Sequence, residues 1–373
     1  MSTSGADKGR DGYLNYRVQN GAVHRLLSRA RLRALVAADG MGVTRRVARS
    51  EWRRRRHLIL CYHGVSIDDE HRWSPLYVSQ ALLIRRVEWL LQNGYSILSL
   101  ADALERVRHG DLPPASVSIT FDDGAYDFAA KAEPVLVDAG VPATLYLTTH
   151  YVERGGPVFD TMMSYLLWKG AGRPFRSRLL GEGTITAPAP DMVAAREDIA
   201  LELKTAAGRA GMSTAEKHGL LEDVARQLCV DFEGLCERRI LHLLAPAEVA
   251  ALHPTLIDVQ LHTHRHQTPK DLVALRAELE DNRAAIARMR AGARSLVHFC
   301  YPSGWHGHWM IPVFEEAGLV SATTCQPGLV SRESPRFFLP RFLDCEDVSD
   351  GVFSAWASGI AALSAQRPTG AST

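Results

Sequence analysis

The strongest constraint on the fold is a regular alternation of short apolar runs and helical segments that begins at His57. Apolar runs bounded by turn residues are typical of buried strands, and segments with apolar residues three and four apart are typical of helices. The apolar runs are HLILCYH (57–63), YSILSL (95–100), SVSITF (116–121), PATLYLTT (142–149), LIDVQLH (256–262), SLVHFCY (295–301), VSATT (320–324) and RFFLPRF (336–342). Strand and helix in regular order predict an α/β fold with a parallel sheet or barrel.

Two segments depart from this alternation. Residues 155–250 show helical spacing and no convincing strand, which predicts a mostly helical insert. Residues 1–56 form a basic N-terminal arm, dense in arginine from Arg25 onwards, with a helix expected over residues 23–36. We expect that helix to pack on the outside of the barrel; the alternative is a peripheral membrane contact between its arginines and anionic lipid. Residues 347–373 are expected to form a C-terminal helix and tail.

Composition limits the classes of partner and the cellular compartment that are expected. The chain has 43 basic and 42 acidic side chains, so its net charge of +1 gives no reason to expect a nucleic acid partner. No signal peptide and no long apolar stretch occurs, and the expected location is the cytoplasm, with membrane contact limited to the arm. The six cysteines include no CxxC pair, so buried, reduced thiols are expected. The oligomeric state is left open.

The first chemical motif is Thr120-Phe121-Asp122-Asp123-Gly124, at the end of an apolar run. In a parallel barrel the carboxyl ends of the strands form the active-site rim. Two adjacent carboxylates there would repel each other in an unliganded pocket, so one can bind a metal ion while the other takes a proton. The alternative is that both aspartates only open the following helix as capping residues.

The second motif is His262-Thr263-His264-Arg265-His266, again directly after an apolar run. Imidazole nitrogen is a common zinc ligand, and a cluster of histidines at a strand end is less often structural than a single one. Two histidines four residues apart and one aspartate would leave an open coordination position, as catalytic metal sites do. The alternative is a polar surface loop that happens to be rich in histidine.

These motifs together resemble the polysaccharide deacetylase family, carbohydrate esterase family 4. The segments Tyr62-His63-Gly64-Val65, His298 to Gly304 and Leu339-Pro340-Arg341 are similar to the YHxV opening strand, the FxYPxG segment and the LPR close of its exopolysaccharide branch. The resemblance covers roughly residues 57–150 and 246–345. It implies a deformed (β/α)7-type barrel, NodB-like, over residues 57–346, interrupted by the insert.

The resemblance also implies roles for individual residues. Asp122 would be the general base, Asp123, His262 and His266 the metal ligands, and Thr263 an orienting hydroxyl. Backbone N–H groups around Tyr301 and Ser303 would be oxyanion donors. The metal is expected to be zinc by default, although cobalt, nickel or manganese accept the same ligands.

The sequence departs from the family pattern in two places. FCYPSG (299–304) lacks the arginine that usually orients the base, and we expect Arg341 to reach Asp122 instead. The general acid also lacks its usual segment, which leaves His63, His264, His306 and His308 as candidates. The implied function is removal of an N-acetyl group from an amino sugar. The alternatives are a deformylase or ester hydrolase acting on a lipid-linked sugar, or a barrel that binds a glycan without turnover.

Overall fold

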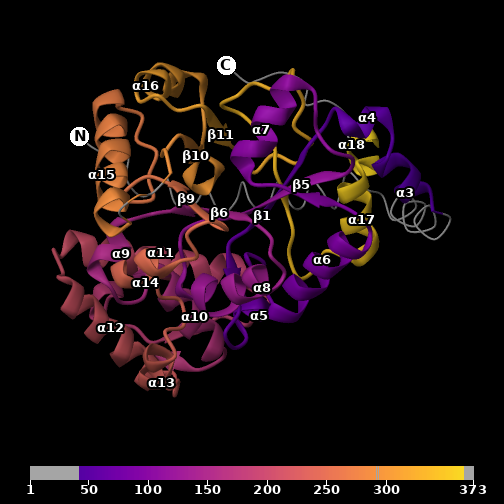
Figure 1. Ribbon diagram of the computed structural model, residues 1–373. Coiled ribbons are helices and arrows are strands. Elements are labelled where there is room, and N and C mark those ends of the chain that lie inside the picture. The colour runs from indigo at the N-terminus through magenta and orange to yellow at the C-terminus, as the bar shows by residue number, and fades with distance from the viewer. Residues whose placement is uncertain (1–41, 291, 293, 365–373) are drawn as a thin grey trace.

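The computed structural model describes residues 42–290, 292 and 294–364. Its centre is an eight-stranded parallel sheet whose order is β11-β10-β9-β6-β5-β1-β12, with β4 paired to β5 at one end. The strands are β1 (Leu58–Tyr62), β4 (Ser96–Ile97), β5 (Ser116–Phe121), β6 (Ala143–Leu147), β9 (Ile257–Leu261), β10 (His298–Cys300), β11 (Ser321–Thr323) and β12 (Phe342–Leu343). The sheet curls into a barrel, and helices surround it in Figure 1.

Closure of the barrel depends on the segment that leads into β12. A parallel bridge joins Thr323 of β11 to Leu339, and Leu60 and Cys61 of β1 pair with β12 a few residues later. This closes a ring of seven strands, as expected for a deformed (β/α)7-type barrel. The predicted strand over residues 336–342 is much shorter in the structure, because Pro340 cannot donate a hydrogen bond to a neighbouring strand.

The helices follow the predicted segments between the strands. They are α6 (Gln80–Gln92), α7 (Leu100–His109), the π-helical turn η1 (Phe128–Ala132) with α8 (Glu133–Asp138), α9 (His150–Arg154), α15 (Leu272–Met289) and α16 (Ile311–Glu316). Three of these helices have a side chain that caps their N-terminus by accepting a backbone N–H. The capping residues are Ser79 for α6, Ser99 for α7 and Asp271 for α15.

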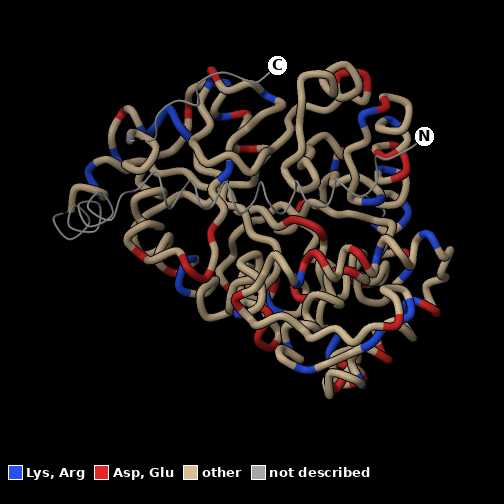
Figure 2. The backbone as a smooth tube through the Cα atoms, turned by 180° about the vertical axis from the view of Figure 1, so that it is seen from behind, with Lys and Arg blue, Asp and Glu red and all other residues tan. Residues whose placement is uncertain are grey.

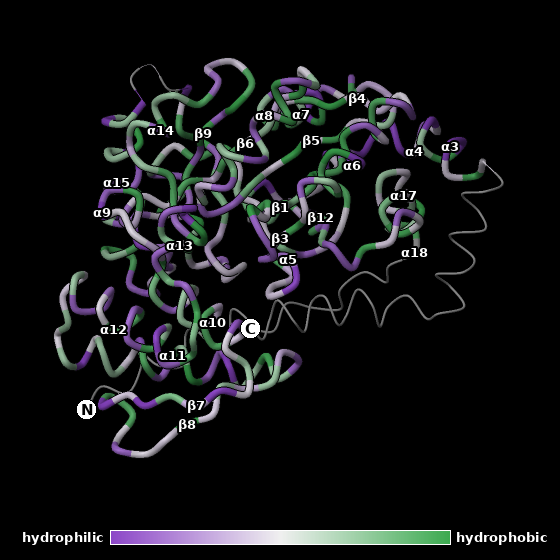
Figure 3. Tube along the Cα trace, turned by 90° about the horizontal axis from the view of Figure 1, so that it is seen from below, coloured by the Kyte–Doolittle hydropathy of each residue, from purple (hydrophilic) through white to green (hydrophobic). Residues whose placement is uncertain are grey.

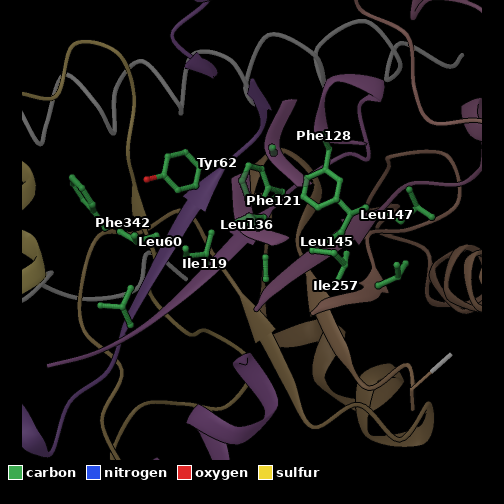
Figure 4. Packing of buried hydrophobic residues seen from close by; sticks show 14 of the residues in the cluster. Leu60, Tyr62, Ile119, Phe121, Phe128, Leu136, Leu145, Leu147, Ile257 and Phe342 are labelled. Atoms are coloured by element: carbon green, nitrogen blue, oxygen red, sulfur yellow. The ribbon is translucent and has the colours of Figure 1, made fainter. Parts of the chain in front are cut away.

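Strand periodicity decides which side chains enter the barrel. Leu60 and Tyr62 of β1, and Ile119 and Phe121 of β5, join the large apolar cluster beneath the helices. Figure 4 shows this packing, in which the Tyr62 and Phe121 rings stack at 5.3 Å and Phe121 meets Phe128 edge-on at 5.0 Å. The alternate residues point to the opposite face of the strands. On β5 the last inward-facing residue is Thr120, and Asp122, directly after the strand, continues the same row.

The insert has a core of its own. Residues between β6 and β9 form α10 (Phe159–Lys169), α11 (Val193–Arg209), α12 (Thr214–Gln227), α13 (Phe232–Glu237) and α14 (Pro246–Ala251). α10 is buried at its centre, and Figure 3 shows this apolar helix inside the insert, apart from the barrel strands. The insert is mostly helical, as expected, and it also contains two short strands that its sequence pattern did not indicate, β7 (Pro174–Phe175) paired with β8 (Ile185–Thr186). Strands of this length produce no visible alternation.

The barrel segment of residues 68–73, which includes the short helix α5 (Glu70–Trp73), packs against the insert. The Trp73 Nε1–H donates to the Ser164 hydroxyl at 3.1 Å, and Lys169 Nζ lies 2.5 Å from an Asp69 carboxylate oxygen. Arg238 pairs with Asp68 at 2.8 Å. Trp73, the last residue of α5, is a packed core residue of the insert.

Part of the basic arm is structural. The described residues of the arm form α3 (Val43–Ala48) and α4 (Glu51–Arg54), whereas the helix predicted over residues 23–36 lies outside the described residues. Arg53 is fully buried and donates to the carbonyl oxygens of Ser116 on β5 and Ala357 on α17 (Asp350–Ser358). Arg53 thus joins the barrel to the C-terminal helices α17 and α18 (Ile360–Ser364).

Charges are mixed over the outside of the molecule. Figure 2 shows basic and acidic residues interspersed on the insert and on the helices around the barrel, in keeping with the net charge of +1. Among the described residues, no helix is both long enough and apolar enough to cross a membrane.

Candidate metal centre and active site

The two sequence motifs meet at the carboxyl ends of two strands of the sheet. Asp122 and Asp123 follow β5, and His262 follows β9, which lies two places along the sheet. The Asp122 N–H donates to the carbonyl of Tyr62, which extends the pairing of β1 and β5 by one bond of 3.0 Å. Neither aspartate caps a helix, since the helical residues that follow begin at Tyr126 and the two carboxylates bond to Arg341 and to the histidines instead. The capping alternative for this motif is therefore excluded.

Asp123, His262 and His266 form a convergent donor set. The Nε2 atoms of both histidines point at the same Asp123 oxygen, at 3.1 Å for His262 and 3.2 Å for His266. One ligand atom from each of the three residues lies within 4.8 Å of the others. A carboxylate and two imidazoles at one strand rim match the donor types of a catalytic zinc site.

The hydrogen bonds around His262 favour a metal. Its Nδ1 lies 2.9 Å from the carbonyl oxygen of Cys300, which can only accept, so Nδ1 carries a proton and Nε2 is left for a cation. Burial alone would raise the pKa of Asp123, but the charge of His266 and the hydrogen bonds from both histidines hold it well below its usual range. The pocket therefore favours a positive charge at the point where the three residues meet.

Asn282 of α15 fixes the strand end that carries His262, and sequence reasoning missed it. Its Oδ1 accepts the His262 N–H at 3.0 Å, while its Nδ2 donates to the Leu147 carbonyl at 2.9 Å and to the Thr149 hydroxyl at 3.0 Å. This buried amide links β6, β9 and α15 behind the histidine. A polar residue on the inward face of an amphipathic helix is the signal that could have identified it.

Several residues around the donor set have left-handed backbone conformations. The φ angles are 73° at Asp123, 61° at Thr263, 55° at His266 and 54° at Ser303. Such conformations cost on the order of 1 kcal/mol or more each, and they persist only where the surroundings enforce them. Gly124, at φ 84°, is required by contact as well, since a β-carbon there would lie 2.2 Å from Leu147 Cδ1. The strand ends are therefore held in one arrangement.

Asp122 and Arg341 form a fully buried, bidentate ion pair. Arg341 Nη1 lies 2.7 Å from Asp122 Oδ1, and Nη2 lies 2.7 Å from Oδ2. The remaining donors of the guanidinium contact the Thr324 carbonyl at 3.0 Å, the Thr120 hydroxyl at 3.1 Å and Cys300 Sγ at 3.1 Å. The expected contact between Arg341 and Asp122 is present, and the planar fork matches the carboxylate.

The ion pair sets the protonation of Asp122. Burial would raise the pKa of this carboxyl, but the charge and hydrogen bonds of Arg341 outweigh it and lower the pKa to about 2. Asp122 is thus ionised throughout the neutral range. Other donor groups in the structure also include Asp122, with Cys61 and His63 or with His262 and Cys300. Because Arg341 contacts both Asp122 oxygens, Asp123 is the better metal ligand of the two.

The three residues expected to contact the substrate or the oxyanion differ in exposure and in hydrogen bonding. Ser303 is exposed at the rim after β10. The Tyr301 N–H donates to the Thr323 carbonyl at 3.3 Å, and its hydroxyl donates to the Phe337 carbonyl at 2.8 Å. A paired N–H inside the sheet counts against Tyr301 as an oxyanion donor. The buried Thr263 hydroxyl accepts the Gln267 N–H at 3.0 Å, so it fixes the turn that carries His266.

Among the four general-acid candidates, His63 is the one placed beside the base. Its Nε2 lies 3.7 Å from Asp122 Oδ2, and its side chain is 16% exposed. His264 is buried and bonded through Nδ1 to the Thr149 hydroxyl at 2.8 Å. His306 Nδ1 lies 2.6 Å from the Gly304 carbonyl, and the His308 ring packs on Phe338.

Part of the chain is similar to a known protein family. Residues 109–177 match the polysaccharide deacetylase family. This segment contains β5, both aspartates and β6, and it ends inside the insert. No curated protein matches the sequence.

One solved deacetylase shares the fold, and two others give lower scores. The Streptococcus pyogenes deacetylase PplD, in complex with acetate, superposes with a TM-score of 0.51 at 15% identity, covering 80% of this chain and 96% of PplD. IcaB from Ammonifex degensii gives a TM-score of 0.48 at 16% identity over 82% of this chain and 97% of IcaB. The BpsB deacetylase domain from Bordetella bronchiseptica gives 0.45 at 15% identity over 78% and 96%. The family match supports a hydrolase that acts on amide bonds, and the likeness to PplD supports the fold.

Proposed function

We propose that this chain is a metal-dependent hydrolase that removes an N-acetyl group from an amino sugar, in an exopolysaccharide or cell-envelope glycan or its precursor. The observation that carries the proposal is the ionised Asp122, held by Arg341, next to the convergent Asp123, His262 and His266. The polysaccharide deacetylase match over residues 109–177 supports a carbohydrate substrate.

Each residue of the site has a distinct task. A divalent metal held by Asp123, His262 and His266, zinc by default, would supply Lewis acidity that polarises the acyl oxygen and acidifies a water molecule. Asp122 accepts the proton of the attacking water. Arg341 keeps Asp122 ionised and aimed, and a carboxylate with so low a pKa is a weak base, so the acidity of the water has to come from the metal. Ser303, which is exposed after β10, would donate its N–H to the oxyanion.

His63 is the residue that we assign as general acid. Cleavage of an amide releases an amine, which is a poor leaving group unless it is protonated. The His63 ring is partly exposed and its Nε2 lies 3.7 Å from Asp122, so a proton taken up by the carboxylate has a short path to it. The other three candidate histidines either are bonded away from Asp122 or pack on Phe338.

The decisive experiment measures acyl release. Metal-loaded protein is incubated with N-acetylated and N-formylated amino sugars and oligosaccharides, beside a chelated sample and one in which metal has been restored. We expect acetate release that the chelator abolishes and added zinc restores. Formate release in place of acetate would reassign the acyl group, and full activity in the chelated sample would refute metal dependence. No release from any compound by metal-loaded protein would count against the proposal.

His63→Gln should separate proton donation from the rest of the chemistry. We expect turnover of an N-acetyl substrate to fall about 100-fold, because the leaving amine is no longer protonated. Hydrolysis of an aryl acetate, whose leaving phenolate needs no proton, should fall far less. The measurement is turnover on both substrates. His308→Gln, an exposed histidine beyond hydrogen-bonding contact with Asp122, is the matched control. An equal loss on both substrates would instead assign His63 to positioning.

A further inference from the structure

Three of the six cysteines surround the Asp122–Arg341 pair, and the proposed hydrolysis uses none of them. Cys61 Sγ lies 3.7 Å and Cys300 Sγ 3.4 Å from Asp122 Oδ2. Arg341 Nη2 lies 3.1 Å from Cys300 Sγ and 3.7 Å from Cys325 Sγ. Strand ends from opposite parts of the chain, β1, β10 and the residues after β11, thus bring three thiols to one guanidinium. We define Cys61, Cys300 and Cys325 as the thiol cluster.

The members of the thiol cluster differ in access. Cys61 and Cys300 are buried inside the barrel, whereas Cys325 lies at the rim and is partly exposed. Gly304 faces Cys325, and a β-carbon at this glycine would lie 3.7 Å from Cys325 Sγ. Gly304 therefore places no side chain against the sulfur.

Cys325 and Cys61 also differ in protonation. The two thiols lie against the same ion pair, Cys61 beside Asp122 Oδ2 and Cys325 beside Arg341 Nη2. The neighbouring Cys61 thiol lowers the pKa of Cys325 to about 6, against the opposing effect of burial, and the charge of Arg341 acts in the same direction. Burial raises the pKa of Cys61 well above its ordinary value. An accessible thiolate next to a buried, protonated thiol is the arrangement of an attacking and a resolving cysteine.

We propose that Cys325 is an oxidation site for hydrogen peroxide or small hydroperoxides and that Cys61 resolves the product into a Cys61–Cys325 disulfide. The Cys325 thiolate attacks one peroxide oxygen, the O–O bond breaks, and hydroxide leaves, so that sulfur is oxidised by two electrons to a sulfenic acid. The Cys61 sulfur then attacks the Cys325 sulfur. The S–S bond forms, the S–O bond breaks, and the hydroxyl leaves with the Cys61 proton as water.

Cys300 is the nearest competitor for both roles. Its thiol lies against an Asp122 oxygen and its pKa is raised, chiefly by burial, so it is neither accessible nor ionised. The third cysteine of the thiol cluster therefore serves as an internal standard. A bond to Cys300 would mean that the contact between Cys61 and Cys325 does not direct the chemistry.

The test is a map of cysteine oxidation in the full-length, metal-loaded protein. The protein is treated with a small excess of hydrogen peroxide, free thiols are alkylated, and disulfide-linked peptides are identified by mass spectrometry. We expect a peptide pair that joins Cys61 to Cys325 and is lost after dithiothreitol. Cys61→Ser should leave Cys325 as a sulfenic acid that dimedone traps, and Cys325→Ser should leave Cys61 reduced. Cys229→Ser, which removes an exposed cysteine of the insert, should change nothing.

Two outcomes would overturn the proposal. One is a disulfide that joins Cys300 to either partner, and the other is a wild-type protein in which Cys61 and Cys325 stay reduced while Cys229 is oxidised. Both are read from wild-type protein, so they do not depend on the folding of a variant. Reversible loss of acetate release on oxidation would follow only if the proposed function also holds, whereas the peptide map is independent of that function.

Discussion

Replacing Asp122 with asparagine is expected to lower turnover by about 100- to 10,000-fold while the protein still binds its metal. The amide cannot accept a proton from water, but it retains an oxygen that can accept a hydrogen bond from Arg341. The three proposed metal ligands, Asp123, His262 and His266, are unchanged. The measurement is turnover on an N-acetyl sugar, beside metal content by elemental analysis and thermal unfolding of the loaded protein.

The matched control for this variant is Asp258→Asn. Asp258 is another buried carboxyl, on β9, and it accepts hydrogen bonds from Gln260 at 3.2 Å. We expect its replacement to leave turnover close to wild type. If Asp122→Asn retained wild-type turnover with metal bound, Asp122 would not be the base. If it lost metal together with activity, Asp122 would belong to the metal site.

Arg341→Ala should lower the free energy of unfolding by more than any of the other substitutions. It leaves the Asp122 carboxylate buried without its partner, and breaking a buried ion pair in this way typically costs about 3–5 kcal/mol. Turnover should fall as well, because Asp122 loses both its charge partner and its orientation. Arg341→Lys should rescue little, since an ammonium group cannot form two parallel hydrogen bonds to one carboxylate. The measurement is the free energy of unfolding in urea.

The double variant Asp122→Asn with Arg341→Ala separates buried charge from lost packing. Removing the carboxylate charge together with the guanidinium should recover part of the stability lost in Arg341→Ala. Arg336→Ala is the surface control, because Arg336 pairs with Glu315 at 2.6 Å where both side chains are more than half exposed. Its cost should stay below about 1 kcal/mol. Equal stability of Arg341→Ala and wild type would contradict the buried pair.

Most of the barrel could be predicted from the sequence because local pattern and tertiary position agree there. β5 coincides with the predicted run SVSITF, since its outward residues are apolar and its neighbours on both sides are strands. β12 is shorter than predicted because Pro340 interrupts the pairing. The β7–β8 hairpin was missed because two-residue strands carry no periodicity. The predicted helix of the arm lies outside the described residues.

The site also contains some residues that could be predicted from the sequence and others that could not. Asp122, Asp123, His262 and His266 are short-range signals, each at a strand end. The contact of Arg341 with Asp122 was expected because FCYPSG lacks the arginine that orients the base in the family that the sequence resembles. Asn282 and the thiol cluster depend on which side chains the closed barrel brings together from distant segments. The Tyr301 N–H was expected to be an oxyanion donor. It instead donates to the Thr323 carbonyl, because β11 lies alongside β10.

The bonds between the insert and residues 68–73 limit how the insert can be exchanged between related barrels. Trp73, Asp69 and Asp68 contact side chains of α10 and of the residue after α13, so the sequence of residues 68–73 and that of the insert constrain each other. An insert taken from another barrel would lack the partners that Trp73, Asp69 and Asp68 bind in this one. Exchange of the insert therefore requires exchange of residues 68–73 as well, and the two segments form one unit of recombination although about 80 residues of barrel separate them in the chain.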